Sequence, residues 1–590
     1  MCGICGELRL DNSRPDADVI SRMLPAIERR GPDAAGRHSD GPVQMGHRRL
    51  SIIDLSDRSA QPMLDKHTDN AIVFNGSIYN YPQLREELQS LGHQFVSSGD
   101  TEVILRAYGQ WGDDFVSRLS GMFAFAIWDA RDKSLLLGRD RMGIKPLYFS
   151  HTSDRFRWAS NTQALLASGD IDTRIDPIAV HHQLTLHASV PAPYTLMRGI
   201  RKLEPGHTLR IKAGEHPRKR RYWQLSAADG EARSDEEWRE ATHEALRVAV
   251  KRRLEIADVP VGVLLSGGLD SSILVGLLAE AGATNLQTFT VGFEDQPEER
   301  GDEFEFADMV AEQYGTRHHQ FQVPNQDLMR RLPEAVAAMA EPMVGQDAAA
   351  FYLLSERVAQ EVKVVQSGQG SDEVFGGYFW YPEMHKAEGE DDLTRFSRRY
   401  FDRDHSEWLQ MIDPEYHTDG DVSSAYVAGL LKQYGEGEYV NRVLAMDTGS
   451  LIVDDPVKRV DNMTMAFGLE ARVPFLDHEL VELVAGMPAR LKLGQGGKGI
   501  LKDISRGIVP DAIIDRPKAY FPVPALKFVR GEVLDFMRDI LNADACRQRG
   551  LFNRAYVDKL LAEPDQHFTR LQGSKLWHLA LLELWMQQHI

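Results

Sequence analysis

Short apolar runs alternate with amphipathic stretches from Cys2 to about Phe156. The runs Cys2–Leu10 and Phe123–Asp129 have the length and composition of strands, and the stretches between them include ranges in which apolar residues recur at helical spacing. Strands and helices mixed in this way predict a layered α+β unit. The other elements predicted here are strands at Ala71–Asn75 and Leu135–Gly138 and helices at Asp16–Arg30 and Pro82–Leu91.

A different pattern begins after Ser234. The long amphipathic stretch Asp235–Leu254 predicts a helix, and the apolar run Val259–Leu265 predicts a buried strand that ends in Ser-Gly-Gly. Strands then alternate with helices, which predicts a parallel sheet with crossover helices, and beyond Tyr381 the pattern is mostly helical. The further elements predicted are helices at Asp270–Gly282, Phe304–Tyr314 and Asp347–Glu361 and strands at Leu286–Gly292, His318–Val323 and Lys363–Gln366.

The two patterns meet at a basic, turn-rich stretch, Lys212–Arg221, which has little to bury and continues as a polar segment to Ser234. We therefore predict a domain over residues 2–211, a linker over 212–234 and a second domain over 235–590. An alternative role for the basic stretch is binding of phosphate or nucleic acid. The acidic balance of the whole chain favours a solvated linker instead.

Composition narrows the class of protein further. Of the 590 residues, 68 are Lys or Arg and 87 are Asp or Glu, so the formal net charge is −19 and no general attraction to nucleic acid or anionic lipid is expected. No run approaches the roughly 18 apolar residues of a membrane helix, and no secretory signal is present. Three cysteines cannot form a disulfide framework. We expect a cytoplasmic protein that binds neither nucleic acid nor membranes.

Cys2 becomes the first residue if the initiator methionine is removed. Its thiol and its own α-amine would then be neighbours, and an amine with a pKa near 8 can act as the base that activates the thiol. Cys2 is therefore a candidate nucleophile. The alternatives are an inert buried thiol and a redox or metal pair with Cys5, but no further suitably spaced ligands complete a tetrahedral metal set.

Four polar segments accompany Cys2 in the first unit, each at a predicted strand end or loop. An arginine can clamp a carboxylate, an Asn-Gly pair can supply an oxyanion hole, and an aspartate can hold an α-ammonium group. These groups are what is needed to hold glutamine while a thiolate attacks its side-chain amide. The segments are Arg29–Asp33, Gly46–Ser51, Phe74–Gly76 and Ser98–Asp100.

The strongest chemical signal is Leu264–Ser272, which reads Leu-Leu-Ser-Gly-Gly-Leu-Asp-Ser-Ser between a predicted strand and a predicted helix. Its glycines let backbone N–H groups approach an anion, its serines add donors, and the helix N-terminus favours negative charge. Asp270 could hold Mg²⁺ on bound phosphates. The chain has no Walker motif, and the Gly-x-Gly-x-x-Gly string at Gly494–Gly499 lacks a preceding strand, which favours a flexible loop.

Together with Glu-Ala-Arg-Val-Pro-Phe-Leu-Asp at Glu470–Asp477, these motifs resemble the glutamine-dependent asparagine synthetases, from Cys2 to about Pro524. The resemblance implies a two-domain α/β and α+β fold. An N-terminal-nucleophile glutaminase of αββα sandwich type would precede an ATP-pyrophosphatase domain with a doubly wound parallel sheet and a helical C-terminal part. It also implies glutamine, ATP and a carboxylate acceptor as substrates, Mg²⁺, an internal ammonia tunnel and activation by adenylation, and it allows homodimeric assembly.

Matching motifs carry the family's roles onto single residues. In the first domain the resemblance makes Cys2 the nucleophile, Asn75 and Gly76 the oxyanion hole, Arg49 the ligand of the glutamine carboxylate and Asp100 the anchor of its amino group. In the second domain it implies an ATP and pyrophosphate site, with Mg²⁺ on two aspartates and a lysine that stabilises phosphate charge. That site comprises Leu264, Ser266, Gly267, Gly268, Asp270, Ser271, Ser272, Val291, Ser367, Gly368, Asp372 and Lys498, with Lys502 a weaker candidate than Lys498.

Three departures from the family pattern bear on the acceptor. Ser77 replaces a glutamate, which leaves Asp100 to carry the glutamine ammonium. Gln369, a candidate acceptor-site residue, replaces a glutamate and cannot act as a base. The Ala-rich stretch Gly345–Ala350 replaces Thr-Thr-Ile-Arg, which favours a bulkier, less charged acceptor than aspartate.

Three segments resemble most the branch that amidates the C-terminal carboxylate of N-acetylglutaminylglutamine to make an osmoprotectant: Met1–Glu7, Pro342–Asp347 and Gln366–Gly370. Alternatives are asparagine synthesis from aspartate and a degenerate ATP-binding regulatory module. Relatives of the Ser-Gly-Gly loop that thiolate tRNA or make NAD fit less well, because the chain carries a Cys2 domain and an acidic balance. We expect most of the aromatic run Tyr378–Tyr381, and the tail from Lys527, to pack in the core.

Overall fold

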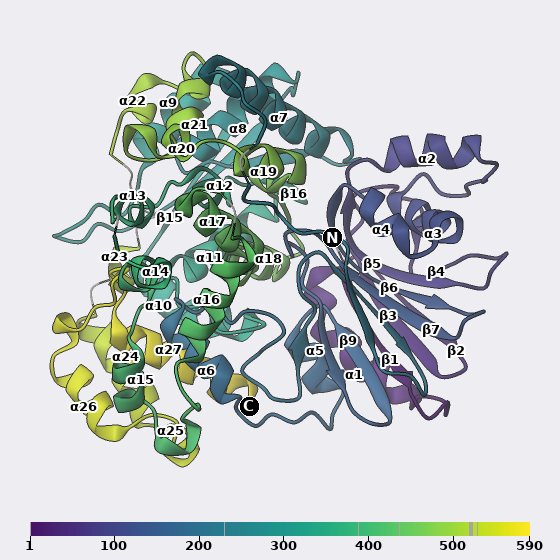
Figure 1. Ribbon diagram of the computed structural model, residues 1–590, viewed down its shortest axis with the longest axis horizontal. Helices are drawn as coiled ribbons and strands as arrows, with labels where there is room; N and C mark the ends of the chain where they lie inside the picture. The colour runs from purple at the N-terminus through teal and green to yellow at the C-terminus, as the bar shows by residue number, and fades with distance from the viewer. Residues whose placement is uncertain (1, 229, 388, 436, 518–522, 528) are drawn as a thin grey trace.

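The computed structural model describes residues 2–228, 230–387, 389–435, 437–517, 523–527 and 529–590, and within them the chain forms two units that lie side by side (Figure 1). In the first unit two antiparallel sheets pack face to face. One sheet has the order β10 (Arg201–Lys202), β8 (Tyr148–His151), β9 (Arg155–Ala159), β1 (Gly3–Arg9), β3 (Val43–Arg49), β2 (Ala34–Asp40). The other has the order β12 (Arg218–Arg221), β11 (His207–Lys212), β7 (Ser134–Arg139), β6 (Gly121–Asp129), β5 (Ala71–Ile78), β4 (Met63–Leu64).

Helices cover the outer faces of both sheets, which gives the predicted αββα sandwich (Figure 1). The central strand β6 is therefore apolar almost throughout, because both of its faces are buried. The predicted strands and helices of this unit are confirmed, with shifts of a few residues at their ends. On one side lie α1 (Ala17–Ala26) and α5 (Thr162–Ala167), and on the other α2 (Tyr81–Ser90), α3 (Asp100–Trp111) and α4 (Phe115–Arg118).

The predicted linker is wrong in part. Lys212 ends β11, and Arg218–Arg221 forms β12, which pairs with β11 at the edge of the sheet. The stretch buries little because it is an edge strand, where charged side chains face solvent and discourage pairing with other chains. Its cations lie against acidic partners: Arg218 against Glu215, Lys219 against Glu204 and Arg220 against Asp114.

The second unit is built on a parallel sheet, as predicted. Its strand order is β15 (Arg317–Val323), β14 (Gln287–Phe293), β13 (Val261–Leu264), β16 (Val364–Gln366), β17 (Glu470–Arg472). Helix α7 (Asp235–Glu255) leads into it and begins at a capping box, in which Ser234 and Glu237 satisfy each other's backbone N–H groups. The crossover helices are α8 (Leu269–Glu280), α9 (Phe304–Tyr314), α10 (Asn325–Ala338) and α11 (Asp347–Val358).

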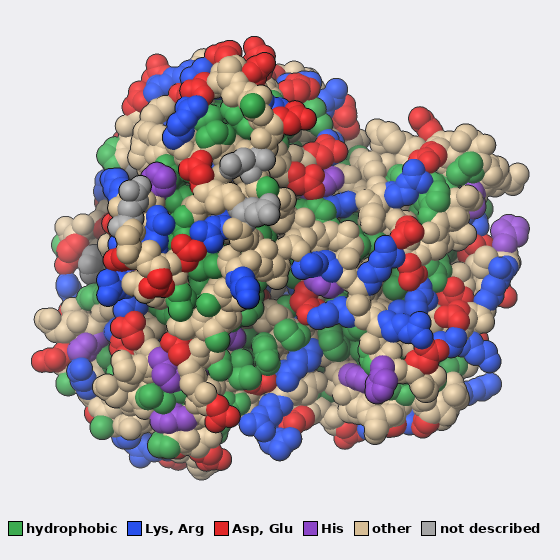
Figure 2. Space-filling view, in the orientation of Figure 1, with side chains coloured by type: hydrophobic (Ala, Val, Ile, Leu, Met, Phe, Trp, Pro, Cys, Tyr) green, Lys and Arg blue, Asp and Glu red, His purple; other side chains and the backbone are tan. Residues whose placement is uncertain are grey.

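The rest of the second unit is helical, as predicted, and its last helix, α27 (Lys575–His589), is buried along most of its length. None of the described helices combines the length and apolar character needed to cross a membrane. Acidic and basic side chains are interspersed over the face of both units that Figure 2 shows. The remaining α-helices of the described residues are α6 (Pro177–Thr185), α12 (Ser371–Phe375), α13 (Trp380–Lys386), α14 (Asp392–Tyr400), α15 (His405–Met411), α16 (Val422–Gln433), α17 (Tyr439–Met446), α18 (Pro456–Met465), α19 (His478–Ala485), α20 (Ala489–Leu493), α21 (Gly499–Ser505), α22 (Asp511–Ile514), α23 (Pro524–Lys527), α24 (Gly531–Asn542), α25 (Asp544–Arg549) and α26 (Arg554–Ala562).

Candidate active sites

A small cavity of about 30 Å³ lies where β1, β3, β5 and α3 of the first unit meet β17 of the second. Four of the residues predicted to handle glutamine line it: Cys2, Arg49, Gly76 and Asp100. Residues distant in sequence therefore converge on one space of the right size for a small ligand group. Met1, whose removal the sequence analysis predicts, lies outside the described residues.

Asn75 is hydrogen-bonded to the candidate nucleophile. The backbone N–H of Cys2 donates to Asn75 Oδ1 at 3.1 Å, and the Asn75 Nδ2 group is buried with no hydrogen-bond partner among the described residues. A buried donor without a partner is costly, so this amide is a ready donor for a ligand oxygen. Gly76 is required for packing, because a Cβ there would lie 2.2 Å from the Met122 carbonyl oxygen. Burial raises the pKa of the Cys2 thiol.

Arg49 and Asp100 supply the two charges that the sequence predicts for this cavity. The Arg49 guanidinium donates to the backbone carbonyls of Ser56, at 2.9 Å, and Asp54, and no carboxylate among the described residues forms an ion pair with it. Its charge is thus oriented by neutral groups. Burial raises the pKa of Asp100 to about 6, although the Ile78 N–H donates to this carboxylate at 3.1 Å.

Sequence reasoning missed that the second unit completes this cavity. Glu470 of β17 lines it and accepts a hydrogen bond from Ser77 Oγ at 3.2 Å. Burial opposes ionisation of Glu470, but Arg472 at 2.5 Å holds its pKa at about 2. Glu470 therefore places a carboxylate of the second unit beside Ser77. The motif Glu470–Asp477 was visible in the sequence, but nothing in its spacing indicates this contact.

Helix α18 connects the surroundings of Cys2 with the second unit. Arg30 Nε donates to the Cys2 carbonyl at 3.2 Å, and Arg30 Nη1 donates to Asp461 of α18 at 2.9 Å. Lys145 reaches the same carboxylate at 3.2 Å. Two residues earlier on α18, Arg459 lines the large cavity of the second unit. One helix therefore lines the large cavity and reaches Cys2 through Arg30.

The large cavity has a volume of about 460 Å³ and lies at the carboxyl ends of β13, β14 and β16, where parallel sheets bind ligands. Most of the predicted nucleotide-site residues line it. Four of them do not line it but adjoin residues that do: Gly267, Gly268, Ser272 and Lys498. The predicted residues that line the cavity are Leu264, Ser266, Asp270, Ser271, Val291, Ser367, Gly368, Gln369 and Asp372.

The loop after β13 has the geometry of an anion site. Gly267 has φ +76°, and a Cβ there would lie 2.8 Å from the Ala307 backbone nitrogen, so only glycine fits. Gly268 is the N-cap of α8, whose N-terminus therefore points its free N–H groups toward the loop. The Ser272 hydroxyl donates back to the Gly268 carbonyl at 2.7 Å, so it supports the helix start.

Lys498 is held between the two aspartates that the sequence assigns to Mg²⁺. Its Nζ lies 2.6 Å from Asp270 and 2.8 Å from Asp372, and these carboxylates raise its pKa despite burial. A Cβ at Gly377 would lie 2.2 Å from Lys498 Cε, so this packing requires glycine. Lys502, the weaker candidate, donates instead to the Gln495 carbonyl at 2.6 Å.

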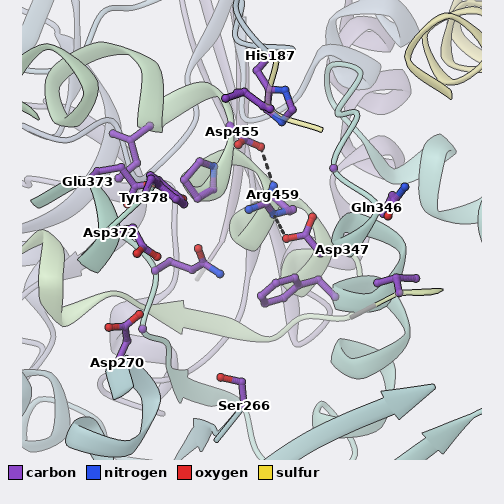
Figure 3. A pocket seen from close by; sticks show the side chains of 18 of the residues that line it. His187, Ser266, Asp270, Gln346, Asp347, Asp372, Glu373, Tyr378, Asp455 and Arg459 are labelled. Carbon is purple, nitrogen blue, oxygen red and sulfur yellow. Dashed lines mark hydrogen bonds and ion pairs between the residues drawn. The ribbon is translucent and has the colours of Figure 1, made fainter. Parts of the chain in front are cut away.

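Beyond the predicted residues, the cavity is lined by charged groups that sequence reasoning missed. Arg459 of α18 lies between Asp347, at 3.1 Å, and Asp455, at 2.7 Å (Figure 3). No recognisable sequence motif links Asp347 with Asp455 and Arg459. The expectation of an alanine-lined pocket is wrong: Ala348–Ala350 are buried in the core, and the cavity wall is formed there by Gly345, Gln346, Asp347 and Phe351.

Burial shifts the pKa values of two further carboxyl groups that face the cavity upward, toward neutral pH. Burial, together with the neighbouring Asp372, raises the pKa of Glu373 to about 8, and burial raises that of Asp447 to about 7. Each accepts a hydrogen bond from a tyrosine of the aromatic run, Tyr378 at 2.8 Å and Tyr381 at 2.6 Å. All four aromatic residues of that run line the cavity, so its predicted role as core packing is incomplete.

In comparison with known proteins, two different family models match the two parts of the chain. The family model for a glutamine amidotransferase domain matches residues 1–223, and the asparagine synthase model matches residues 241–587. A glutamine-hydrolysing asparagine synthetase of Bacillus subtilis is 31% identical, over 99% of this chain and 96% of that protein.

Two further matches complete the comparison. A putative glutamine-hydrolysing asparagine synthetase of Mycobacterium tuberculosis is 32% identical, over 96% of this chain and 93% of that protein. Among solved structures, the glutamine phosphoribosylpyrophosphate amidotransferase of B. subtilis matches with a TM-score of 0.31 and 15% identity, over 56% of this chain and 92% of that one. The chain belongs to the asparagine synthase family, with a glutamine amidotransferase domain ahead of its synthase domain.

Proposed function

We propose that this enzyme amidates the C-terminal carboxylate of an N-blocked peptide of the N-acetylglutaminylglutamine kind. As a member of its family the chain is a glutamine-hydrolysing carbon–nitrogen ligase of the asparagine synthetase type that uses ATP. What is proposed is the acceptor, the division of roles among residues and the use of Mg²⁺.

In the proposed glutaminase reaction the Cys2 thiolate attacks the side-chain amide of glutamine and releases ammonia. Asn75 Nδ2 and the Gly76 N–H stabilise the oxyanion, the role for which the unpartnered amide is suited. Arg49 holds the glutamine carboxylate and Asp100 the ammonium, with Glu470 adding negative charge nearby. Burial keeps water from competing for these charges.

In the proposed synthetase reaction the acceptor carboxylate attacks the α-phosphate of ATP, pyrophosphate leaves, and ammonia then displaces AMP. The Ser266–Ser272 loop and Lys498 bind the phosphates, while Leu264, Val291, Ser367 and Gly368 form the wall of the nucleotide site. Asp270 and Asp372 fit Mg²⁺, because this ion is bound in proteins by one or two carboxylates together with substrate phosphates. It would supply charge neutralisation on the departing pyrophosphate.

The charge state of the cavity is the observation on which the proposed acceptor rests. Free aspartate brings an α-ammonium that needs an ionised, unpaired carboxylate. Asp347 and Asp455 share one cation, Arg459, and burial raises the pKa values of Glu373 and Asp447 to about 8 and about 7, so that at pH 7 Glu373 is mostly protonated and Asp447 about half protonated. Together with the neutral Gln369, this set favours an acceptor without a free amino group.

The test is to measure pyrophosphate release from Mg-ATP and glutamine with N-acetylglutaminylglutamine and with free aspartate in parallel. We expect release and a new peptide amide, detected by mass spectrometry, with the dipeptide alone. Release with aspartate alone would establish the second candidate, asparagine synthesis, which the names of the bacterial relatives favour. Pyrophosphate release with neither acceptor would favour a degenerate module.

A further inference from the structure

The end of the large cavity opposite the phosphate loop is formed by two histidines that share one buried carboxylate. Figure 3 places His187 across the cavity from Ser266, with Arg459 between them. His187 follows α6, His578 lies on α27, and both line the cavity. Asp402, which follows α14, is 2% exposed and lies behind them. The sequence analysis singles out none of these residues, and the proposed reaction steps do not use them.

Asp402 lies beside Nδ1 of both imidazole rings and is hydrogen-bonded to that of His187. Its Oδ2 lies 3.0 Å from His187 Nδ1 and 3.5 Å from His578 Nδ1. Because Nδ1 of each ring faces the carboxylate, Nε2 of each ring points away from it. A carboxylate behind a histidine fixes the ring and its tautomer in this way at many functional sites. The centroids of the two rings are 5.6 Å apart, so one small group can reach both.

The two rings differ in charge. Burial disfavours the charged form of His187, but Asp402 raises its pKa to about 9, so both ring nitrogens carry protons and Nε2 is a donor. Burial lowers the pKa of His578 to about 3, so this ring is neutral. Asp402 beside its Nδ1 favours the proton there, which leaves Nε2 as an acceptor. The pair thus offers one donor and one acceptor side by side.

We propose that His187 and His578, oriented by Asp402, form a subsite that recognises a carboxamide group of the acceptor. The amide oxygen accepts from His187 Nε2, and the amide N–H donates to His578 Nε2. A carboxylate, an ammonium or a hydrocarbon group cannot satisfy both. This subsite deepens the proposed function, on which it rests, because a glutaminyl peptide carries such amides in its side chains.

Gly573 keeps the acceptor nitrogen accessible. A Cβ at this position would lie 2.8 Å from His578 Nε2, closer than a carbon approaches without displacing its neighbour. Gly573 also lines the cavity, and its backbone does not lie in the left-handed region. Alanine there is therefore compatible with the local backbone but obstructs the proposed hydrogen bond. This gives a variant that tests the subsite without removing a buried side chain.

The experiment compares two N-acetylated dipeptide acceptors, one with the glutaminyl amides and one in which methyl-terminated side chains of equal length replace them. In the wild type we expect kcat/KM to favour the amide by on the order of 100-fold, because a site built for an amide leaves polar groups unpaired with the analogue. Gly573→Ala and His578→Ala should bring the ratio near one, and His578→Gln, which retains an acceptor oxygen, should restore part of it. His385→Ala, at an exposed histidine of α13, is the control.

The two proposals fail in different ways. If the wild type amidates the peptide but all variants keep its preference for the amide, the subsite is wrong and the proposed function stands. If the wild type uses aspartate alone, the proposed function fails, and the subsite fails with it.

His187, Asp402 and His578 also have the composition of a metal site, with ligand atoms within 4.8 Å of one another. Stoichiometric Zn²⁺ retained on the purified enzyme, and lost in His578→Ala, would overturn amide recognition. KM for ATP and basal glutamine hydrolysis report on folding in every variant.

Discussion

The two candidate sites differ in size and in how their residues are held. The glutamine cavity, of about 30 Å³, is lined by few residues, and its charges, Arg49, Asp100 and Glu470, each have a fixed partner in the surrounding backbone or side chains. The synthetase cavity, of about 460 Å³, is lined by residues from many separate segments. The large cavity has room for two substrates together, whereas the small one has room only for a small ligand group.

This contrast indicates where the specificity of the enzyme lies. In the small cavity the motif residues Cys2, Arg49 and Asp100 lie together, with Glu470 hydrogen-bonded to Ser77. In the large cavity the phosphate end retains the residues expected from the motif, whereas the far end, around Arg459 and His187, follows no motif found in the sequence. Under the proposed function, the residues that select the acceptor are therefore expected at the far end.

The largest effect should separate the two sites completely. Cys2→Ala removes the nucleophile, so glutamine-dependent synthesis should fall by at least about a thousand-fold, while synthesis with added ammonium salt continues at its wild-type rate. The measurement is product formation with each nitrogen source at saturating ATP and acceptor. Loss of both activities would contradict independent chemistry at the two cavities.

Lys498→Ala should have the converse effect. Without its charge between Asp270 and Asp372, acceptor-dependent exchange of pyrophosphate into ATP should fall by about 100- to 1,000-fold, whereas basal glutamine hydrolysis is retained. Lys502→Ala is the matched control, since Lys502 lies in α21, the helix whose N-cap is Lys498, and donates to a backbone carbonyl. An equal loss in both variants would show that α21 is only structural.

The glutamine cavity should respond to pH through Asp100. Its raised pKa of about 6 means that the carboxylate is ionised above pH 6 and protonated below it, and only the ionised form attracts the glutamine ammonium. We expect kcat/KM for glutamine hydrolysis to fall about tenfold per pH unit below that value. Asp100→Asn should lower the plateau and remove this limb of the profile. A variant profile with the same limb would assign it to another group.

The sequence predicted the fold because the relevant signals are local. Apolar runs and helical spacing predicted the strands of both units, and the motif around Ser266 predicted a phosphate site because a strand, a glycine turn and a helix are adjacent in the chain. Strand β12 was missed because its four basic residues, Arg218–Arg221, carry no apolar pattern. An edge strand that is exposed on this scale looks like a linker in sequence.

The residues of the candidate sites differ in the same way, because some lie in a local sequence motif and others do not. Cys2, Arg49 and Asp100 were found because a family motif surrounds each one. Glu470 on the glutamine cavity and the trio of His187, Asp402 and His578 arise from the packing of segments hundreds of residues apart. No spacing rule relates such positions, and only the folded chain shows that they meet. Single-sequence reasoning therefore reaches the reaction class before it reaches the acceptor.

The smallest predicted effect tests how far the two cavities are independent. Ser77→Ala removes one hydrogen bond to the ionised Glu470, which remains paired with Arg472. Since a hydrogen bond to a charged group contributes about 1.5–3 kcal/mol and the remaining ion pair offsets part of that loss, KM for glutamine should rise by less than about tenfold. Steady-state glutamine hydrolysis measures this rise.

The same variant should leave ammonia-dependent synthesis unchanged. A fall in that activity would mean that a change in the glutamine cavity alters the acceptor cavity through the contact between the units. The small and the large cavity would then be coupled and not independent.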